Sequence, residues 1–263
     1  MFAEYLKRDL IKGFGTYQIK DRSIIDSAVR NGYNLLDCAE LYKNEDMVID
    51  VIRSYPDKQI FVSTKISYIS IEKREIEKSF NERLEKFKGI RINLLLLHKP
   101  SDDCRRDWSV LCELYSRHRD KIDYIGVSNY DLKHLEQIKG LPIPFVNQFE
   151  LNPFNVRMEL VDFCRNSGII IVSHTTLTRT VKFDNPVLIS IAGKYRASVA
   201  KLLLRWAIQN GYVTIPRSSR LDHLLENISA MSNNFQAFDI STEDMKVLNG
   251  DLNEGFFLTK VMF

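Results

Sequence analysis

The sequence predicts a (β/α)8 TIM barrel formed by one domain that spans residues 1–263. Three observations lead to this prediction. Short apolar runs alternate with longer amphipathic segments, a pattern typical of parallel strands joined by helical crossovers. Eight such runs are present, which is the number that a closed barrel of this kind needs. The chain length of 263 residues also fits, because these barrels commonly contain about 250 residues.

The strands are predicted from apolar runs, and the helices from the segments between them. The runs lie at residues 11–15, 34–37, 60–64, 92–97, 122–126, 145–148, 169–173 and 212–215. The helical segments lie at residues 22–31, 44–54, 71–87, 105–118, 131–138, 157–167, 197–210 and 221–231. An open doubly wound sheet is the alternative fold. Against it, no Gly-x-Gly-x-x-Gly motif follows the first run, and Gly13-Phe14-Gly15 is a lone Gly-x-Gly.

Helix boundaries in the sequence support these limits. Asp21 can cap the first helix, which ends before Asn31-Gly32. Ser70 precedes the charged segment that opens the third helix. Asn166-Ser167-Gly168 and Asn210-Gly211 are helix stops directly before the seventh and eighth apolar runs.

Composition excludes several classes of function. The net charge is +3, with both signs interspersed, so we expect no nucleic-acid partner. No apolar run approaches the ~20 residues of a membrane span, and the N-terminus has no signal-peptide pattern; we therefore expect no membrane partner and a cytoplasmic location. The four cysteines show no metal-site spacing, which indicates free thiols and no metal site. We expect a monomer.

Four polar residues lie where apolar runs stop. Asp37, Lys65 and His98 each end a run, and Tyr42 follows Asp37 by five residues. In a parallel barrel the C-terminal strand ends share one face, where active sites form. We therefore expect an acid, a base, an imidazole and a phenol to meet in one pocket.

These residues belong to longer motifs whose order along the chain is informative. The motifs lie at residues 13–16, 32–45, 63–65, 96–100, 125–130, 146–153 and 215–220, followed by residues 226 and 227. Taken in this order, they resemble the aldo-keto reductase family over roughly residues 13–227. The resemblance implies a (β/α)8 barrel that binds a nicotinamide cofactor without a Rossmann fold. It also implies the reduction of an aldehyde or ketone, a small-molecule carbonyl substrate, to an alcohol by hydride transfer.

The resemblance assigns a catalytic role to each of the four residues. Tyr42 would donate the proton, Lys65 and Asp37 would be its ion-paired neighbours, and His98 would orient the carbonyl. Free tyrosine has a pKa of ~10, and we expect the nearby ammonium of Lys65 to lower that of Tyr42. A hydrogen bond from His98 would stabilise the developing oxyanion.

The resemblance also implies a site for NADPH or NADP+, with NADH as the alternative cofactor. The implied residues are Gly15, Thr16, Asp37, Ser128, Asn129, Gln148, His174, Thr175, Leu177, Ile215, Arg217, Ser218, Ser219, Arg220, His223, Glu226 and Asn227. Ser128, Asn129 and Gln148 would hold the carboxamide. Arg217 and Arg220, next to a helix start, suit a phosphate.

Three positions depart from the family pattern. His174 replaces the aromatic ring that stacks on the nicotinamide, His223 replaces an arginine beside the adenosine phosphate, and Lys99 replaces a tryptophan near the pocket. We expect a weakened preference for NADPH. Lys99, with Tyr17 as a second substrate residue, either favours anionic or polar carbonyl substrates or extends into solvent.

Two alternative functions remain open at this point. Lys65 could form a Schiff base in an aldolase-type barrel, since a strand-borne lysine suits that chemistry. The chain could also be a non-catalytic regulatory protein that binds NADP(H) on the same fold.

Overall fold

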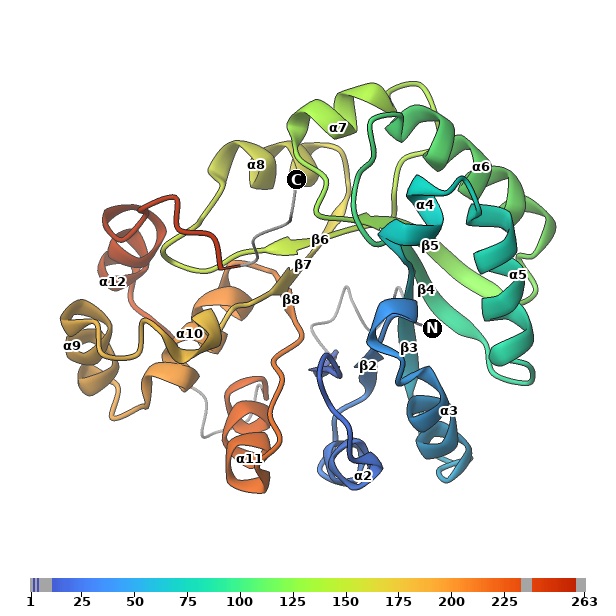
Figure 1. The fold of residues 1–263 in the computed structure, drawn as a ribbon. Helices are drawn as coiled ribbons and strands as arrows, with labels where there is room; N and C mark the ends of the chain where they lie inside the picture. The colour runs from blue at the N-terminus through green and yellow to red at the C-terminus, as the bar shows by residue number, and fades with distance from the viewer. Residues whose placement is uncertain (1, 3, 5–10, 233–237, 259–263) are drawn as a thin grey trace.

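Eight parallel strands form one sheet in which every strand pairs with its neighbours in chain order, from β1 to β8. The structure is a computed structural model that describes residues 2, 4, 11–232 and 238–258. The strands are β1 (Gly13–Gly15), β2 (Leu35–Asp37), β3 (Phe61–Ile66), β4 (Ile92–Leu97), β5 (Ile122–Ser128), β6 (Val146–Glu150), β7 (Ile170–His174) and β8 (Val213–Thr214). Figure 1 shows them at the centre of the molecule, with the helices outside.

The two ends of the sheet meet. The backbone N–H of Gly15, the last residue of β1, donates to the carbonyl of Pro216 just after β8 at 3.1 Å. Gly13 approaches β8 so closely that a Cβ atom there would lie 2.4 Å from the carbonyl oxygen of Thr214, so only glycine fits. This contact closes a (β/α)8 barrel, and the predicted fold is confirmed. The sequential strand order excludes the doubly wound alternative.

The helices follow the strands in alternation. They are α2 (Arg22–Arg30), α3 (Glu45–Arg53), α4 (Tyr68–Glu72), α5 (Ile76–Lys86), α6 (Cys104–Arg117), α7 (Leu132–Gln137), α8 (Met158–Asn166), α9 (Pro186–Lys194), α10 (Val199–Gln209), α11 (Leu221–Ala230) and α12 (Thr242–Lys246). Two 3₁₀ turns, η1 (Glu40–Tyr42) and η2 (Thr178–Thr180), and a π-helical turn, η3 (Val247–Asp251), complete the elements. Asp21 caps α2 as predicted, because its carboxylate accepts from the N–H of Ser23 at 2.8 Å.

The structure corrects two helix predictions. The segment at residues 71–87 forms two helices, α4 and α5, because Arg74 between them adopts the left-handed conformation with φ 59°. The first of these starts after Ser67, which accepts from the N–H of Ser70 at 3.2 Å, so Ser70 lies inside α4 rather than at its cap. The helix α9 was not predicted, although Asn185 caps it and Pro186 occupies its first turn.

Alternate residues of each strand face two different cores. Leu95 and Leu97 of β4 pack with the helices, whereas Leu94 and Leu96 join Phe61 and other strand residues in a second cluster. Because successive strand side chains point to opposite faces, the second cluster fills the inside of the barrel. The interior is therefore packed, and a pocket has to lie at its mouth.

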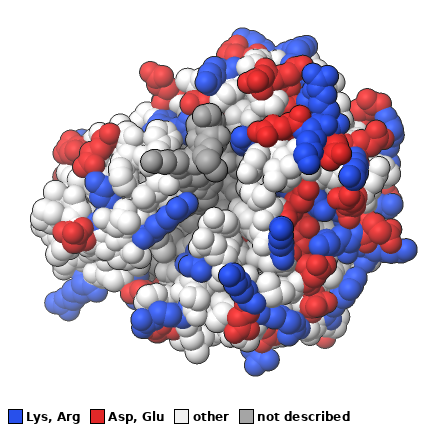
Figure 2. Space-filling view, in the orientation of Figure 1, with Lys and Arg blue, Asp and Glu red and all other residues white. Residues whose placement is uncertain are grey.

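The surface shows no large region of one charge on the face drawn in Figure 2, where Lys and Arg side chains are mixed with Asp and Glu, most densely on the side of α5 and α6. Of the helices that the structure describes, none is both long and apolar enough to cross a membrane.

Candidate active site

The alternation of side chains along each strand directs the predicted acid, base and imidazole into the mouth of the barrel. Asp37 shares the inward face of β2 with Leu35, Lys65 shares that of β3 with Phe61, and His98 continues the inward face of β4 directly after its end. The sequence therefore places the three side chains on one surface, since the carboxyl ends of parallel strands meet at one end of the barrel.

The four side chains lie close together. The Lys65 Nζ atom is 2.6 Å from Asp37 Oδ2 and donates to the Cys38 carbonyl at 2.9 Å. Tyr42, at the end of η1, lies with its ring centroid 5.1 Å from Lys65 Nζ. Its ring meets that of His98 edge to face, with centroids 5.6 Å apart. The structure thus brings the predicted residues together, while their catalytic roles stay a prediction.

Asp37 is held from a second side. Its Oδ1 atom accepts a hydrogen bond from Gln148 Nε2 at 2.9 Å, and the carboxylate is almost fully buried. Gln148 also accepts, through its backbone carbonyl, from the Ser128 hydroxyl at 2.9 Å and the Asn129 N–H at 2.8 Å. We call Asp37, Tyr42, Lys65 and His98 the tetrad. This chain of contacts connects the tetrad to the residues predicted to hold a carboxamide.

The protonation states follow from burial and neighbouring charge. Burial raises the pKa of Tyr42 to about 12, although the Lys65 ammonium opposes the rise. The predicted lowering of this pKa is therefore wrong for the net value, because desolvation of the phenolate outweighs the attraction of the ammonium. The phenol of Tyr42 keeps its proton across the neutral range.

The pKa values of Lys65 and His98 shift in opposite directions. Burial disfavours the Lys65 ammonium, but Asp37 and Tyr42 outweigh it and raise the pKa of the lysine above its usual value. Burial, followed by the charge of Lys65 and by His174, lowers the pKa of His98 well below its usual value. The cluster thus holds a neutral phenol, a charged ammonium and a neutral imidazole. His98 Nδ1 is buried and has no hydrogen-bond partner among the described residues.

His174 is fixed at both ring nitrogens. Its Nε2 atom lies 2.9 Å from Asn129 Oδ1, and its Nδ1 atom lies 2.9 Å from the Thr175 hydroxyl oxygen. Burial and the charge of Lys65 lower the pKa of His174 to about 3, so the ring is neutral. Because an amide oxygen only accepts, Nε2 carries the hydrogen and Nδ1 accepts from Thr175.

Asn129 occupies a strained backbone conformation with φ 61° and uses both ends of its side-chain amide. The nitrogen donates to the carbonyl of His98 at 3.0 Å and to the Ser128 hydroxyl at 3.1 Å, while the oxygen accepts from His174. The cap of α7 is Asp131, whose carboxylate accepts from the N–H of Leu132 at 3.0 Å. Sequence reasoning missed the Asn129–His174 contact, since nothing local links two residues that are 45 positions apart.

The predicted phosphate residues follow β8. Ser218 is buried and its hydroxyl accepts from the N–H of Arg220 at 3.1 Å. Arg220 makes a two-pronged ion pair with Asp222, at 2.6 Å and 3.1 Å. The charge of Arg220 is therefore balanced by a carboxylate, whereas Arg217 extends its side chain into solvent.

The remaining predicted cofactor residues lie at the carboxyl ends of strands, in the loops that follow them, or in α11. These are Gly15 and Thr16 at the end of β1, Thr175 and Leu177 after β7, Ile215 and Ser219 after β8, and His223, Glu226 and Asn227 in α11.

Lys99 does not extend freely into solvent. Its Nζ atom lies 3.0 Å from Glu72 Oε1 and 4.4 Å from the centroid of the Tyr68 ring, and both partners belong to α4. Tyr17, the other predicted substrate residue, is partly exposed and packs on Tyr42 with ring centroids 5.0 Å apart.

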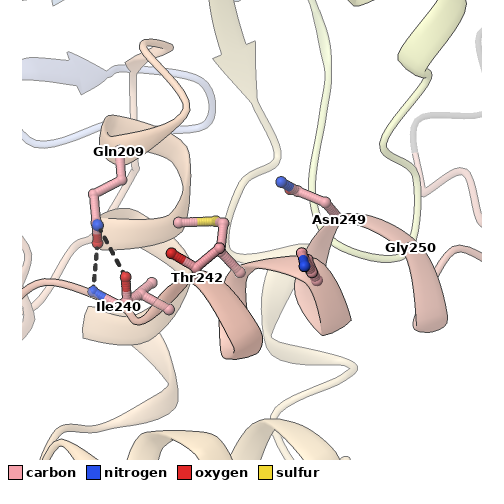
Figure 3. A pocket seen from close by; sticks show the side chains of 7 residues that line it. Gln209, Ile240, Thr242, Asn249 and Gly250 are labelled. Atoms are coloured by element: carbon pink, nitrogen blue, oxygen red, sulfur yellow. Dashed lines mark hydrogen bonds between the residues drawn. The ribbon is translucent and has the colours of Figure 1, made fainter.

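A cavity of about 430 Å³ lies elsewhere, between the end of α10 and α12. Figure 3 shows its lining, where the Gln209 amide bonds to both the N–H and the carbonyl of Ile240. None of the tetrad residues lines it, so it is separate from the site at the mouth of the barrel. The described residues contain no cluster of His, Cys, Asp or Glu that could hold a metal ion.

Fold and site together define a class of protein. A closed (β/α)8 barrel carries a Tyr–Lys–Asp–His cluster at its mouth, with a neutral acid beside a fixed ammonium, which suits an oxidoreductase acting on a carbonyl group. The sequence matches the Aldo/keto reductase family over residues 13–246. The chain belongs to this family, and it is an NAD(P)H-dependent oxidoreductase.

Known proteins resemble the chain over most of its length. It is 34% identical to glyoxal reductase of Bacillus subtilis over 242 residues, which are 89% of the chain and 85% of that protein. It is 30% identical to methylglyoxal reductase DkgB of Yersinia pestis over 239 residues, 87% of the chain and 90% of the relative. Its structure is similar to that of MGS-M4, an aldo-keto reductase from a deep-sea metagenome library, with a TM-score of 0.84 and 26% identity over 94% and 92% of the two chains.

Proposed function

We propose that the protein reduces small aldehydes or ketones to alcohols with NADPH as the preferred cofactor and Tyr42 as the proton donor. The neutral phenol of Tyr42, packed against the charged Lys65, is the observation that carries this proposal. The named activities of the relatives, glyoxal reductase and methylglyoxal reductase, support small dicarbonyl compounds as the substrate class.

The tetrad residues divide the work of proton transfer. When the carbonyl oxygen of the substrate gains negative charge, the Tyr42 hydroxyl donates its proton to it. The resulting phenolate is stabilised by Lys65, whose charge is maintained by Asp37 at 2.6 Å. His98, neutral and with Nδ1 unpartnered in the described structure, offers a ring nitrogen to orient the carbonyl.

The residues present fit a nicotinamide cofactor. Polar groups of Ser128, Asn129 and Gln148 line the ends of β5 and β6 beside the tetrad, where they would hold the carboxamide. Arg217 would hold a phosphate at the start of α11, whose backbone N–H groups favour an anion. When bound, the cofactor supplies the hydride. The ion pair between Arg220 and Asp222 leaves less free positive charge for a 2′-phosphate. We therefore expect Arg217 to carry the preference for NADPH over NADH and that preference to be moderate.

The Schiff-base alternative is not favoured by the site. An amine must be neutral to attack a carbonyl, but Asp37 and the Cys38 carbonyl both accept from Lys65, whose pKa is raised. Borohydride treatment in the presence of glyoxal should therefore leave Lys65 unmodified, as read by peptide mass.

The direct test measures the loss of NADPH absorbance with a panel of small aldehydes and dicarbonyls. We expect the Tyr42→Phe variant to lose at least about 100-fold in kcat, the usual contribution of a positioned acid. Tyr115→Phe is the matched control. Tyr115 lies in α6, and its hydroxyl donates to the carbonyl of Asp123 rather than to a tetrad residue. Full turnover in Tyr42→Phe would refute the assigned donor. Tight NADPH binding by the wild type without turnover would support a non-catalytic regulator instead.

A further inference from the structure

The segment that carries Tyr42 is too short to hold itself in place. Tyr42 ends η1, a single 3₁₀ turn, and the next residue, Lys43, has a left-handed backbone with φ 54°. Short 3₁₀ turns have poorer hydrogen-bond geometry than α-helices. The position of the phenol therefore depends on contacts that its neighbours make with the rest of the barrel.

One such contact lies on the inner side of the segment. Asn44 donates to the carbonyl of Thr16 at 2.7 Å, and the N–H of Thr16 donates to the carbonyl of Asp37 at 2.9 Å. These bonds fix the chain just after Tyr42 relative to β1 and β2. The chain before η1 is bonded to β3, since the N–H of Cys38 donates to the carbonyl of Ser63 at 2.8 Å.

Glu40, at the start of η1, is anchored on the outer side. Its carboxylate accepts from the N–H of Ser67 at 2.8 Å, from the Ser70 hydroxyl at 2.9 Å and from the Ser79 hydroxyl at 2.7 Å. These donors come from the loop after β3, from α4 and from α5. Glu40 thus links η1 to three separate segments.

Glu45, three residues beyond Tyr42, is anchored in the same region. It is almost fully buried and accepts from the Thr64 hydroxyl at 2.5 Å. Thr64 directly precedes Lys65 in β3. A buried carboxylate is costly unless it is paired and hydrogen-bonded, so Glu45 needs a cation.

Arg83 of α5 is the cation that lies against both carboxylates, and Lys86 Nζ lies farther from Glu45 Oε2, at 3.9 Å. Its Nη1 atom lies 3.0 Å from Glu40 Oε2, and its Nε atom lies 3.3 Å from Glu45 Oε2. The Arg83 side chain is only 7% exposed. Nε makes no hydrogen bond among the described residues, so the link to Glu45 is an ion pair, while Nη1 also donates to the Ser79 hydroxyl at 3.1 Å. One extended planar guanidinium thus reaches two carboxylates at once, which a compact ammonium does less readily.

We propose that Arg83 is a positioning residue for Tyr42, holding the two carboxylates that flank the proton donor so that the phenol stays against Lys65. Arg83 belongs to α5 on the outside of the barrel, and its ion-pair partners are Glu40, Glu45 and its own neighbour Glu82, none of them a tetrad residue. Of these partners only Glu40 and Glu45 flank Tyr42, so any effect of Arg83 on the phenol passes through them. The inference rests on the proposed function, because it concerns the residue assigned there as the acid.

The test compares Arg83→Met and Arg83→Lys with a matched buried arginine. Arg205 of α10 is also buried, and it bonds the carbonyl of Phe238 and pairs with Asp239 at 2.8 Å, away from the tetrad. Arg205→Met therefore removes a buried guanidinium without disturbing η1. Each variant is assayed for kcat, for NADPH affinity by fluorescence titration and for melting temperature, with kinetics measured well below the lowest melting temperature.

We expect Arg83→Met to lower kcat by about 10- to 100-fold, the loss that follows a displacement of reacting groups by roughly 1 Å. NADPH affinity should change less than about twofold, because the cofactor residues are untouched. Arg83→Lys should have a higher kcat than Arg83→Met, since lysine restores the positive charge but not the planar, extended guanidinium group. Arg205→Met should lower the melting temperature and keep wild-type kcat.

If Arg83→Met does not fold, Glu40→Gln tests the same ion pair between Arg83 and Glu40 with a smaller change. We expect this variant to lower kcat by about tenfold at unchanged NADPH affinity. Wild-type kcat in a folded Arg83→Met or Glu40→Gln variant would overturn the inference, as would an equal loss of kcat in Arg205→Met. Absence of turnover in the wild type would refute the proposed function itself, so the two failures are distinguishable.

Discussion

Replacing His174 with glutamine should remove part of the acid sensitivity of the fold. His174 is half-buried and hydrogen-bonded between Asn129 and Thr175, and its pKa is lowered to about 3 from an ordinary value of 6.5. Between these values the unfolded chain binds a proton that the folded chain does not bind. The free energy of unfolding therefore falls as the pH drops below about 6.5, and the loss is complete near pH 3.

The loss of unfolding free energy can be calculated from the interval between the ordinary pKa of histidine and the working pH. Each unit between the ordinary pKa and the working pH costs about 1.4 kcal/mol, so His174 alone should lower the free energy of unfolding by about 2 kcal/mol between pH 7 and pH 5. Glutamine cannot titrate, yet its amide can still donate to Asn129. The variant should lose about 2 kcal/mol less than the wild type over this range.

The assay is urea unfolding at a series of pH values, followed by the fluorescence of the buried Trp108 and Trp206. His98 also titrates with a lowered pKa and is present in both proteins; because His174 is the smallest of the causes of that shift, after burial and Lys65, most of the His98 contribution cancels in the difference. Parallel curves for wild type and His174→Gln from pH 7 to pH 5 would refute the account of His174 as a ring that stays neutral in the folded protein.

Three further predictions concern packing, capping and cofactor choice. Gly126→Ala should lower stability by about 1–3 kcal/mol, because a Cβ atom there would lie 2.5 Å from the carbonyl of Val146; an unchanged melting temperature would contradict this. Asn185→Ala should cost about 1 kcal/mol by removing the cap of α9, with Asn185→Ser as the tolerated control in the same denaturation experiment. Arg217→Ala should raise KM for NADPH roughly tenfold, by loss of one charge-assisted contact, and leave KM for NADH unchanged, whereas Arg220→Ala should have a smaller effect since Asp222 already balances its charge; equal changes for both cofactors would argue against a 2′-phosphate contact.

The barrel was accessible from sequence because its strands are apolar runs punctuated by helix stops. Asp37, Lys65 and His98 could also be predicted to converge, since strand ends in a parallel barrel share one face. The helix α9 is not predicted by the alternation of apolar runs, although the sequence carries two local signals for it, the cap Asn185 and the first-turn Pro186.

Other features depend on distances that a sequence does not contain. The sequence supplies the charge of Lys65 beside Tyr42 but not the burial that outweighs it, so the direction of the net pKa shift was wrong. Arg83 lies 43 positions from Glu40 and 38 from Glu45, and its pairing with both arises only after α5 packs on β3. The ion pair of Arg220 with Asp222, by contrast, joins residues that are close in sequence. It competes with the role in phosphate binding that the sequence predicts for Arg220.

The order of the strands separates two properties along the chain. The proposed proton donor and its three partners all lie within residues 37–98, whereas most of the proposed cofactor contacts lie within residues 128–227. Cofactor preference can therefore drift or be engineered in the C-terminal half while the proton relay in the N-terminal half is inherited intact. The hydrogen bond from Gln148 to Asp37 joins the two halves, and exchange of half-barrels between relatives would have to preserve it.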